Sequence, residues 1–314
     1  MKLALVFPGQ GSQAVGMLQT FADSTPVRET FAEAADVLGQ DLWRLAADGP
    51  AEDLNSTVNT QPLMLAAGYA VYRAWREAGG PAPAIVAGHS LGEYTALVVA
   101  GVVSLRDALP LVRLRAQAMQ DAVPVGTGAM AAILGLDDDA VRAACAESAQ
   151  GEVVEAVNFN APSQVVIAGH KAAVERAAAA AKAKGAKRAV MLPVSAPFHA
   201  SLLKPAAERL EQVLAGITFH APQIPIVNNV DVAVVTDPQL IKAALARQAC
   251  SPVRWVEMIQ HMARSGVTHV GECGPGKVLA GMTRRIESGL QGFAIADAAS
   301  LAQSVQALKE AADA

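Results

Sequence analysis

Short apolar runs typical of buried strands alternate in this chain with segments whose apolar residues have helical spacing. Residues 3–7 and 84–87 are apolar runs closed by Pro-Gly or Gly. Helix-compatible apolar spacing follows each of them, at 27–38 and at 91–99. Strands that alternate with helices in this way predict a parallel sheet covered by helices.

Between residues 126 and 197 the pattern becomes more compact. It predicts strands at 129–134, 153–158, 164–168 and 187–192, and helices at 139–148 and 172–184. Asp137 or Asp138 is expected to cap the first of these helices, and Gly185 to end the second. The resulting order β-α-β-β-α-β is the ferredoxin-like arrangement.

The helical pattern returns after His199 and continues to the end of the chain. We predict helices up to 214 and at 240–248, 253–264, 278–286 and 301–312, with short strands at 225–227 and 268–271. The fold class is therefore α/β, with a hydrolase-like large domain formed by 1–125 and 198–314. A small ferredoxin-like domain, 126–197, is inserted into it.

Composition limits the partners that the chain can have. Of its 314 residues, 52% are hydrophobic, and 25 Lys plus Arg against 29 Asp plus Glu give a net charge of −4. Without an excess of positive charge, we expect no binding to nucleic acid. No uncharged apolar stretch reaches the roughly 18 residues of a membrane-spanning helix, and the apolar start is too short for a signal peptide. We expect a cytoplasmic protein that does not enter a membrane.

The cysteines give no indication of a disulfide framework or a metal site. Cys145, Cys250 and Cys273 are widely separated, odd in number, and form no C-x-x-C pair. We therefore expect them to be small core residues, and we expect no bound metal.

Two glycine-rich segments after predicted strands resemble nucleotide-binding loops only in part. Residues 9–14 fit G-x-G-x-x-[G/A], but Pro8 interrupts the strand, and a charged helix follows where a second apolar strand is needed. Residues 271–277 fit a P-loop frame, but Val278 stands where a hydroxyl would bind magnesium, and Pro275 removes a backbone donor. We interpret the second segment as a tight strand-to-helix turn.

A third segment, Gly88 to Gly92, has the G-x-S-x-G pattern of a nucleophile elbow between a strand and a helix. Such a turn strains Ser90 and leaves its hydroxyl at a helix N-terminus, where developing negative charge is favoured. The alternative is that Ser90 and Glu93 form an S-x-x-E capping box, in which neither need be catalytic. A capping box does not require both flanking glycines, so the pattern favours the nucleophile.

A serine nucleophile needs a base, and six histidines are available. His199 lies in the rigid segment Ser-Ala-Pro-Phe-His, where the small domain is predicted to return to the large one. His89 adjoins Ser90 but is expected to point away from it, and His170 could cap the helix that follows. The other three fit ordinary strand and helix positions: His220, His261 and His269.

Short motifs are spread over nearly the whole chain. They are FPGQGSQ at 7–13, GHSLGEY at 88–94, the region of Arg115, NFN at 158–160, PFH at 197–199, RQ at 247–248 and GPG at 274–276. In this order they resemble the malonyl-CoA:acyl carrier protein transacylases of bacterial type II fatty acid synthesis. One motif alone would be weak evidence, but the ordered set is specific.

The resemblance implies roles for individual residues. Ser90 would attack the malonyl thioester and carry the acyl group, with His199 acting as base and then as acid. The backbone carbonyl of Gln248 would orient the imidazole, so that no triad carboxylate is needed. The backbone N–H groups of Gln10 and Leu91 would form the oxyanion hole.

The same resemblance implies a substrate pocket. Arg115 would hold the free carboxylate of malonyl with a bidentate fork, although sequence alone favours a surface arginine on a helix at 111–119. Met119 and Phe198 would line the acyl pocket. Leu91 and Phe198 are similar to the residues of malonyl-selective relatives.

The activity expected from the resemblance is ping-pong transfer of malonyl from coenzyme A to the phosphopantetheine thiol of holo acyl carrier protein. The partners would be this carrier and a coenzyme A thioester, with no further cofactor, and the chain would be a monomer. Because the carrier is typically acidic, a basic patch is expected near the cleft. Candidate members, which could equally form a solvated helix face, are Lys182, Lys184, Lys187 and Arg188.

Two other functions remain open at this point. A serine esterase or thioesterase would share Ser90 and His199 but use water as the acceptor, with its acid drawn from the carboxylates between them: Asp121, Asp137, Asp138 and Asp139. A non-catalytic module that binds the carrier protein would need neither Ser90 nor His199, and the presence of both argues against it.

Overall fold

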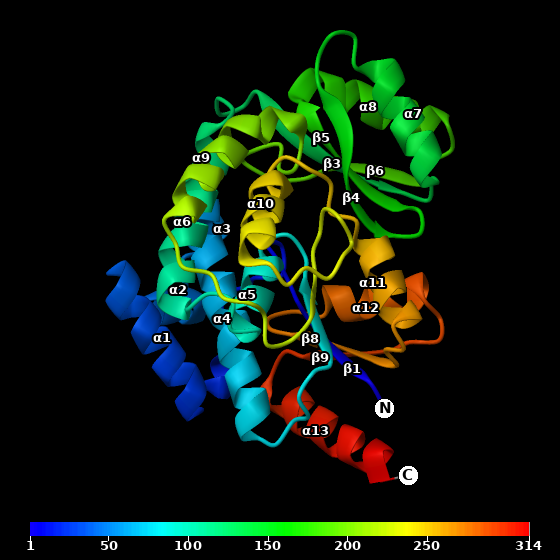
Figure 1. Ribbon diagram of the computed structural model, residues 1–314. Coiled ribbons are helices and arrows are strands. Elements are labelled where there is room, and N and C mark those ends of the chain that lie inside the picture. The colour runs from blue at the N-terminus through cyan, green and yellow to red at the C-terminus, as the bar shows by residue number, and fades with distance from the viewer. Residues whose placement is uncertain (314) are drawn as a thin grey trace.

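The larger of two β-sheets in the computed structural model, which describes residues 1–313, is parallel (Figure 1). Its strand order is β7-β2-β1-β8-β9. The strands are β1 (Leu3–Phe7), β2 (Ile85–Gly88), β7 (Ile226–Val227), β8 (His269–Cys273) and β9 (Gln291–Ile295). The predicted parallel sheet is thereby confirmed, with β1 at its centre.

Both faces of the larger sheet are buried, because successive residues of a strand point to opposite sides. Leu3, Leu5 and Phe7 of β1 belong to the core on one side, whereas Ala4 and Val6 belong to the core on the other. This explains why β1 is a continuous apolar run instead of an alternating one.

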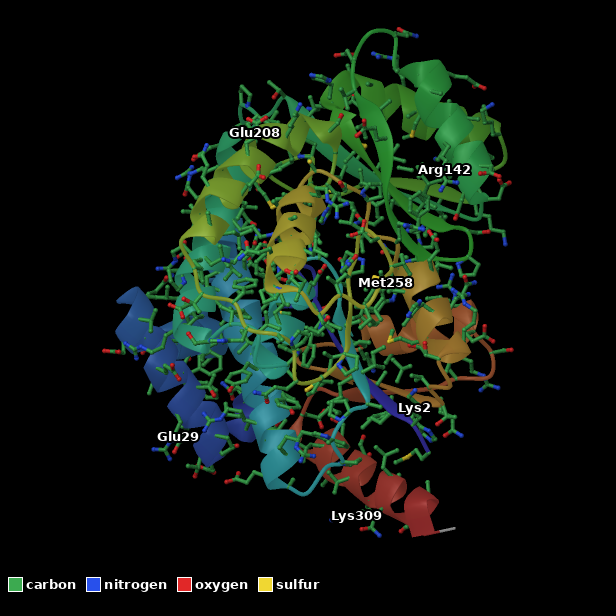
Figure 2. The ribbon with its side chains drawn as sticks, in the orientation of Figure 1. Lys2, Glu29, Arg142, Glu208, Met258 and Lys309 are labelled. Atoms are coloured by element: carbon green, nitrogen blue, oxygen red, sulfur yellow. The ribbon has the colours of Figure 1, made fainter. Side chains whose placement is uncertain are left out.

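Helices from several parts of the chain build these two cores. The first core is formed by α1 (Thr25–Leu38), α2 (Leu42–Asp48), α3 (Ala51–Asn55), α4 (Thr57–Glu77), α5 (Gly92–Val99), α6 (Leu105–Asp121), α9 (Lys204–Ala215), α10 (Pro238–Gln248) and α13 (Ala298–Asp313). The second is formed by α11 (Trp255–Arg264) and α12 (Val278–Ile286). Figure 2 shows Met258 of α11 in the interior, while Lys2, Glu29 and Lys309 lie at the periphery.

The smaller sheet is antiparallel, with the order β4-β5-β3-β6. Its elements are β3 (Gly128–Leu134), α7 (Asp138–Ser148), β4 (Val154–Ala161), β5 (Gln164–His170), α8 (Lys171–Ala183) and β6 (Arg188–Met191). Both helices cover one face, as Figure 1 shows, and the ferredoxin-like order is confirmed. The domain boundaries at 125/126 and 197/198 stay a prediction.

Strand β4 of the smaller sheet is hydrogen-bonded to the segment that precedes α11 of the large domain. The N–H of Phe159 donates to the carbonyl of Val253 at 3.0 Å, and the N–H of Val253 donates to Val157 at 2.8 Å. Met130 and Val166, on the face of the smaller sheet away from α7 and α8, pack with Ala200 in a separate apolar cluster. This face therefore lies against the segment that carries His199.

Some local predictions differ from the structure. Strand β9 was not predicted, because its first residues, Gln291 and Gly292, are exposed and the strand carries no apolar alternation. His170 occupies the N-cap position of α8, as expected, but its side chain does not cap the helix: its Nδ1 accepts from the N–H of Val153 at 2.9 Å. In residues 1–313, no helix is both long and apolar enough to cross a membrane.

Candidate active site

Ser90 lies in a sharp turn between β2 and α5. Its φ of 52° is in the left-handed region, which non-glycine residues rarely adopt without a functional reason. The side chain of Asn229 holds this turn from both sides: its Oδ1 accepts from the Ser90 N–H at 2.8 Å, and its Nδ2 donates to the Gly88 carbonyl at 2.7 Å. The geometry is that of a nucleophile elbow.

The two glycines of the elbow permit close backbone approach. A Cβ on Gly88 would lie 1.9 Å from the carbonyl of Gly92, and a Cβ on Gly92 would lie 2.0 Å from the carbonyl oxygen of Phe7. The alternative capping box does not form, because Leu91 is the N-cap of α5 and Oγ of Ser90 bonds to His199 and Arg115 instead. The Glu93 carboxylate is buried and makes its hydrogen bonds elsewhere.

His199 is positioned to act as the base for Ser90. The Oγ of Ser90 lies 2.7 Å from Nε2 of His199, and Nδ1 lies 2.9 Å from the backbone carbonyl oxygen of Gln248. A carbonyl can only accept, so Nδ1 carries the proton and Nε2 accepts from the serine hydroxyl. Burial, together with the charge of Arg115, lowers the pKa of His199 to about 3. The imidazole is therefore neutral near pH 7.

None of the carboxylates considered for an esterase triad contacts the imidazole. Asp121 pairs with Arg209 at 3.3 Å. Asp137 caps α7, while Asp138 and Asp139 lie in the first turn of that helix. A backbone carbonyl occupies the place of the triad acid, as the resemblance implied.

Arg115 is 1% exposed, so its interpretation as a surface residue is wrong. Its Nη1 donates to Oε1 of Gln61 at 2.7 Å. Its Nη2 donates to Oε1 of Gln248 at 2.9 Å and to Oγ of Ser90 at 3.1 Å. The guanidinium lies 5.3 Å from the ring centroid of Tyr94, and its Nε has no partner within residues 1–313. A buried cation with a free donor thus lies beside the nucleophile.

The first glycine loop packs directly on the elbow. A Cβ on Gly9 would lie 2.6 Å from the carbonyl oxygen of His89 and 3.7 Å from the nitrogen of Leu91. In the described part of the chain, the N–H groups of Gln10 and Leu91 donate to no protein acceptor. Both residues line the same cavity as Ser90, so this loop can present backbone donors to an oxygen there.

A cavity of about 230 Å³ lies between the larger sheet and the smaller one, with Ser90 at its wall. Every residue that the resemblance placed in the site lines this cavity except Gln248, which lies behind His199. The lining residues are Gln10, Gln61, His89, Ser90, Leu91, Arg115, Met119, Met130, Asn158, Asn160, Val166, Leu192, Val194, Phe198 and His199.

Sequence reasoning missed several polar residues of the site. Gln61 lies on α4 in a stretch with no motif, and Asn229 follows β7 in a loop, so neither carries a local signal. His89 was not expected in the site, yet it lines the same cavity as Ser90, and its Nε2 lies 2.7 Å from Oδ1 of Asn160. Asn160 belongs to the NFN motif, which could have identified it.

Comparison with known proteins agrees with this geometry. Residues 4–306 match the family described as Acyl transferase domain. The malonyl CoA-acyl carrier protein transacylase of Escherichia coli K12 is 57% identical over 306 residues, 97% of this chain and 99% of that protein. Its counterpart in Bacillus subtilis is 43% identical over 99% of both.

Solved structures agree as well. The acyl-carrier-protein S-malonyltransferase of Burkholderia pseudomallei is 68% identical, with a TM-score of 0.96 over 98% of this chain and 100% of that one. A malonyl-transacylase in complex with a type II PKS acyl-carrier protein is 54% identical, with a TM-score of 0.96 over the same shares. The chain belongs to the acyl transferase family and, within it, to the malonyl CoA-acyl carrier protein transacylases.

Proposed function

We propose that this chain transfers malonyl from malonyl-CoA to the phosphopantetheine thiol of holo acyl carrier protein, through an ester on Ser90. The observation that carries the proposal is the pairing of Ser90 with His199 at 2.7 Å, directly beside the buried guanidinium of Arg115. A hydrolase for neutral esters has no need of a buried cation at the nucleophile. The names of the relatives support malonyl-CoA and the carrier as substrates.

In the first half-reaction, Oγ of Ser90 attacks the thioester carbonyl while its proton moves to Nε2 of His199. The carbonyl oxygen becomes negatively charged and accepts from the N–H groups of Gln10 and Leu91. When the tetrahedral intermediate collapses, the carbon–sulfur bond breaks, and the imidazolium returns its proton to the sulfur of coenzyme A. The product is a malonyl ester of Ser90.

Arg115 would bind the carboxylate at the far end of the acyl group. Its Nε–H has no acceptor within residues 1–313, and Nε and Nη2 form one edge of the guanidinium. Such an edge can hold a carboxylate through two parallel hydrogen bonds once the carboxylate replaces one of the two present acceptors of Nη2, Ser90 or Gln248. Met119 and Phe198 would contact the acyl chain, and the apolar lining would limit the access of water to the ester.

In the second half-reaction, the same groups act in reverse order. The thiol of the carrier's phosphopantetheine gives its proton to Nε2 of His199, and its sulfur attacks the ester carbonyl. The bond to Oγ of Ser90 breaks, and Oγ takes the proton back. The carbonyl of Gln248 keeps the proton of Nδ1 in place through both halves.

The carrier would dock at one end of the smaller sheet. Lys187 and Arg188 are exposed there. In the register of the sheet, Leu134 of β3 lies between Arg188 of β6 and Gln164 of β5. Gln164 accepts from Arg285, so Arg188 and Arg285 lie at the same end of the sheet. This basic group complements an acidic carrier. Of the other two candidates, Lys182 is exposed and Lys184 is paired with Glu147.

Transfer of labelled malonyl from coenzyme A to purified holo carrier protein, with free malonate measured in parallel, tests the proposal. We expect label on the carrier, and a gain of one malonyl group in the intact mass after brief exposure to malonyl-CoA. The variant Ser90→Ala should show neither, whereas Ser265→Ala, which removes an exposed hydroxyl, should show both.

Other outcomes would contradict the proposal in different ways. Rapid release of malonate with no label on the carrier would indicate an esterase. Label on the carrier with Ser90→Ala would indicate another nucleophile. Neither product from the native chain would indicate a binding role.

A further inference from the structure

A buried carboxylate lies behind the nucleophile, and the proposed mechanism gives it no part. Glu93 is 3% exposed and belongs to the same turn-and-helix segment as Ser90. Its Oε2 accepts from Nε2 of Gln248 at 2.8 Å and from the N–H of Asn229 at 3.1 Å. The same two residues also hold the backbone of the elbow: Gln248 donates to the Ser90 carbonyl at 2.9 Å, and Oδ1 of Asn229 accepts from the Ser90 N–H.

Gln248 also connects this carboxylate to the buried guanidinium. Its Oε1 accepts from Nη2 of Arg115 at 2.9 Å, while its Nε2 donates to Glu93. Arg115 makes no direct ion pair within residues 1–313; its partners are neutral. A buried cation needs a compensating charge nearby, and Glu93, one amide away, supplies it.

We propose that Glu93 is the counter-ion of Arg115 in the free enzyme, and that it takes up a proton when the malonyl carboxylate binds to Arg115. The inference rests on the carboxylate-binding role proposed for Arg115. Two carboxylates facing one buried cation cannot both stay ionised at low cost. The substrate carboxylate is the stronger acid and contacts Arg115 directly, so Glu93 is the group that becomes neutral.

The surroundings of Glu93 allow this proton uptake near neutral pH. Burial raises the pKa of Glu93 to about 7, and the charge of Arg115 opposes this rise. The other charged or titratable groups that face it are Asp231, paired with Arg247 of α10, and Tyr94 on its own helix. The pKa of Tyr94 is raised to about 12, so Tyr94 stays neutral. Binding a further negative charge at Arg115 raises the pKa of Glu93 again.

The test is the pH dependence of the preference for malonyl-CoA over acetyl-CoA. The ratio of their kcat/KM values cancels effects on the base and on the coenzyme phosphates, which both substrates share. We expect this ratio to fall about tenfold between pH 6 and 9, because Glu93 is neutral at the lower pH and repels the malonyl carboxylate when it is ionised at the higher pH. Glu93→Gln keeps the acceptor oxygen and should make the ratio independent of pH. Asp231→Asn, a control at the neighbouring carboxylate, should keep the fall.

A second measurement uses only the native protein. Formation of the malonyl ester in weak buffer above pH 7 should withdraw protons from solution, as read by an indicator dye, whereas the acetyl ester should not. A large malonyl preference that does not change with pH, or esters that form without proton uptake, would overturn the role of Glu93. A ratio near one at every pH, or no malonyl ester at all, would instead overturn the proposed function.

Discussion

Arg115→Met removes the guanidinium while filling most of its volume, and therefore tests how the chain selects a substrate with a free carboxylate. Two hydrogen bonds between a guanidinium and a carboxylate contribute about 1.5–3 kcal/mol each. Their loss should lower kcat/KM for malonyl-CoA by roughly 3–6 kcal/mol, or about 10²–10⁴-fold. Acetyl-CoA offers no carboxylate, so its kcat/KM should change far less.

The cost in folding stability should be smaller than the cost in transfer. The substitution leaves Oε1 of Gln61 and Oε1 of Gln248 without their donor, at about 1–3 kcal/mol each. It also removes a buried charge, whose desolvation opposes folding. We expect a net loss of about 1–3 kcal/mol in the free energy of unfolding, which leaves the protein folded in the assay.

The assay measures transfer of labelled malonyl and acetyl by the native chain, Arg115→Met and Arg106→Met. Arg106 lies on the same helix but is exposed and paired with Asp36, so its replacement should change neither transfer rate. An equal loss of malonyl and acetyl transfer in Arg115→Met would refute a carboxylate-specific role. Arg115→Met should also raise the pKa of His199, because the guanidinium's positive charge opposes protonation of the imidazole.

Three further predictions concern the base and the elbow. Because the pKa of His199 is lowered to about 3, kcat/KM for acetyl transfer should not fall as the pH is lowered through 6.5, where an ordinary imidazole gains its proton; a fall there would contradict the buried neutral base. Gly92→Ala would place its Cβ 2.0 Å from the Phe7 carbonyl oxygen and should lower the free energy of unfolding, measured in urea, by about 2–4 kcal/mol. The control Gly281→Ala, in open space on α12, should leave this free energy unchanged or raise it. Asn229→Ala removes the two hydrogen bonds from this side chain to the turn and should slow formation of the malonyl ester, as measured by intact mass; native rates would contradict its role.

The sequence predicts those parts of the fold and site that local chemistry determines. The elbow is one of them, because a strand, two glycines and a serine within five residues are enough to specify the turn. The ferredoxin-like insert is another, since its strands and helices can be predicted from short apolar runs and from local signals such as the Asp137 cap of α7. Strand β9 has no such signal, since it depends on pairing with β8 for its place in the sheet.

The burial of Arg115 could not be predicted from local pattern. Its hydrogen-bond partners Gln61 and Gln248 are 54 and 133 residues away in the chain, on α4 and α10. Only the packing of these helices on α6 makes the interior polar at this point. The resemblance to a family supplied the role of Arg115, but not Gln61 or Asn229, which carry no motif.

A backbone carbonyl in place of a triad carboxylate has an electrostatic consequence for this substrate. The carbonyl of Gln248 fixes the tautomer of His199, as a carboxylate would, but it adds no full negative charge to the site. A carboxylate in that place would act on Arg115 at short range, compete with malonyl for the guanidinium, and raise the pKa of His199. The counter-charge is instead held one amide further away, on Glu93, where a proton can neutralise it. The site thus keeps the base neutral and Arg115 able to bind a carboxylate.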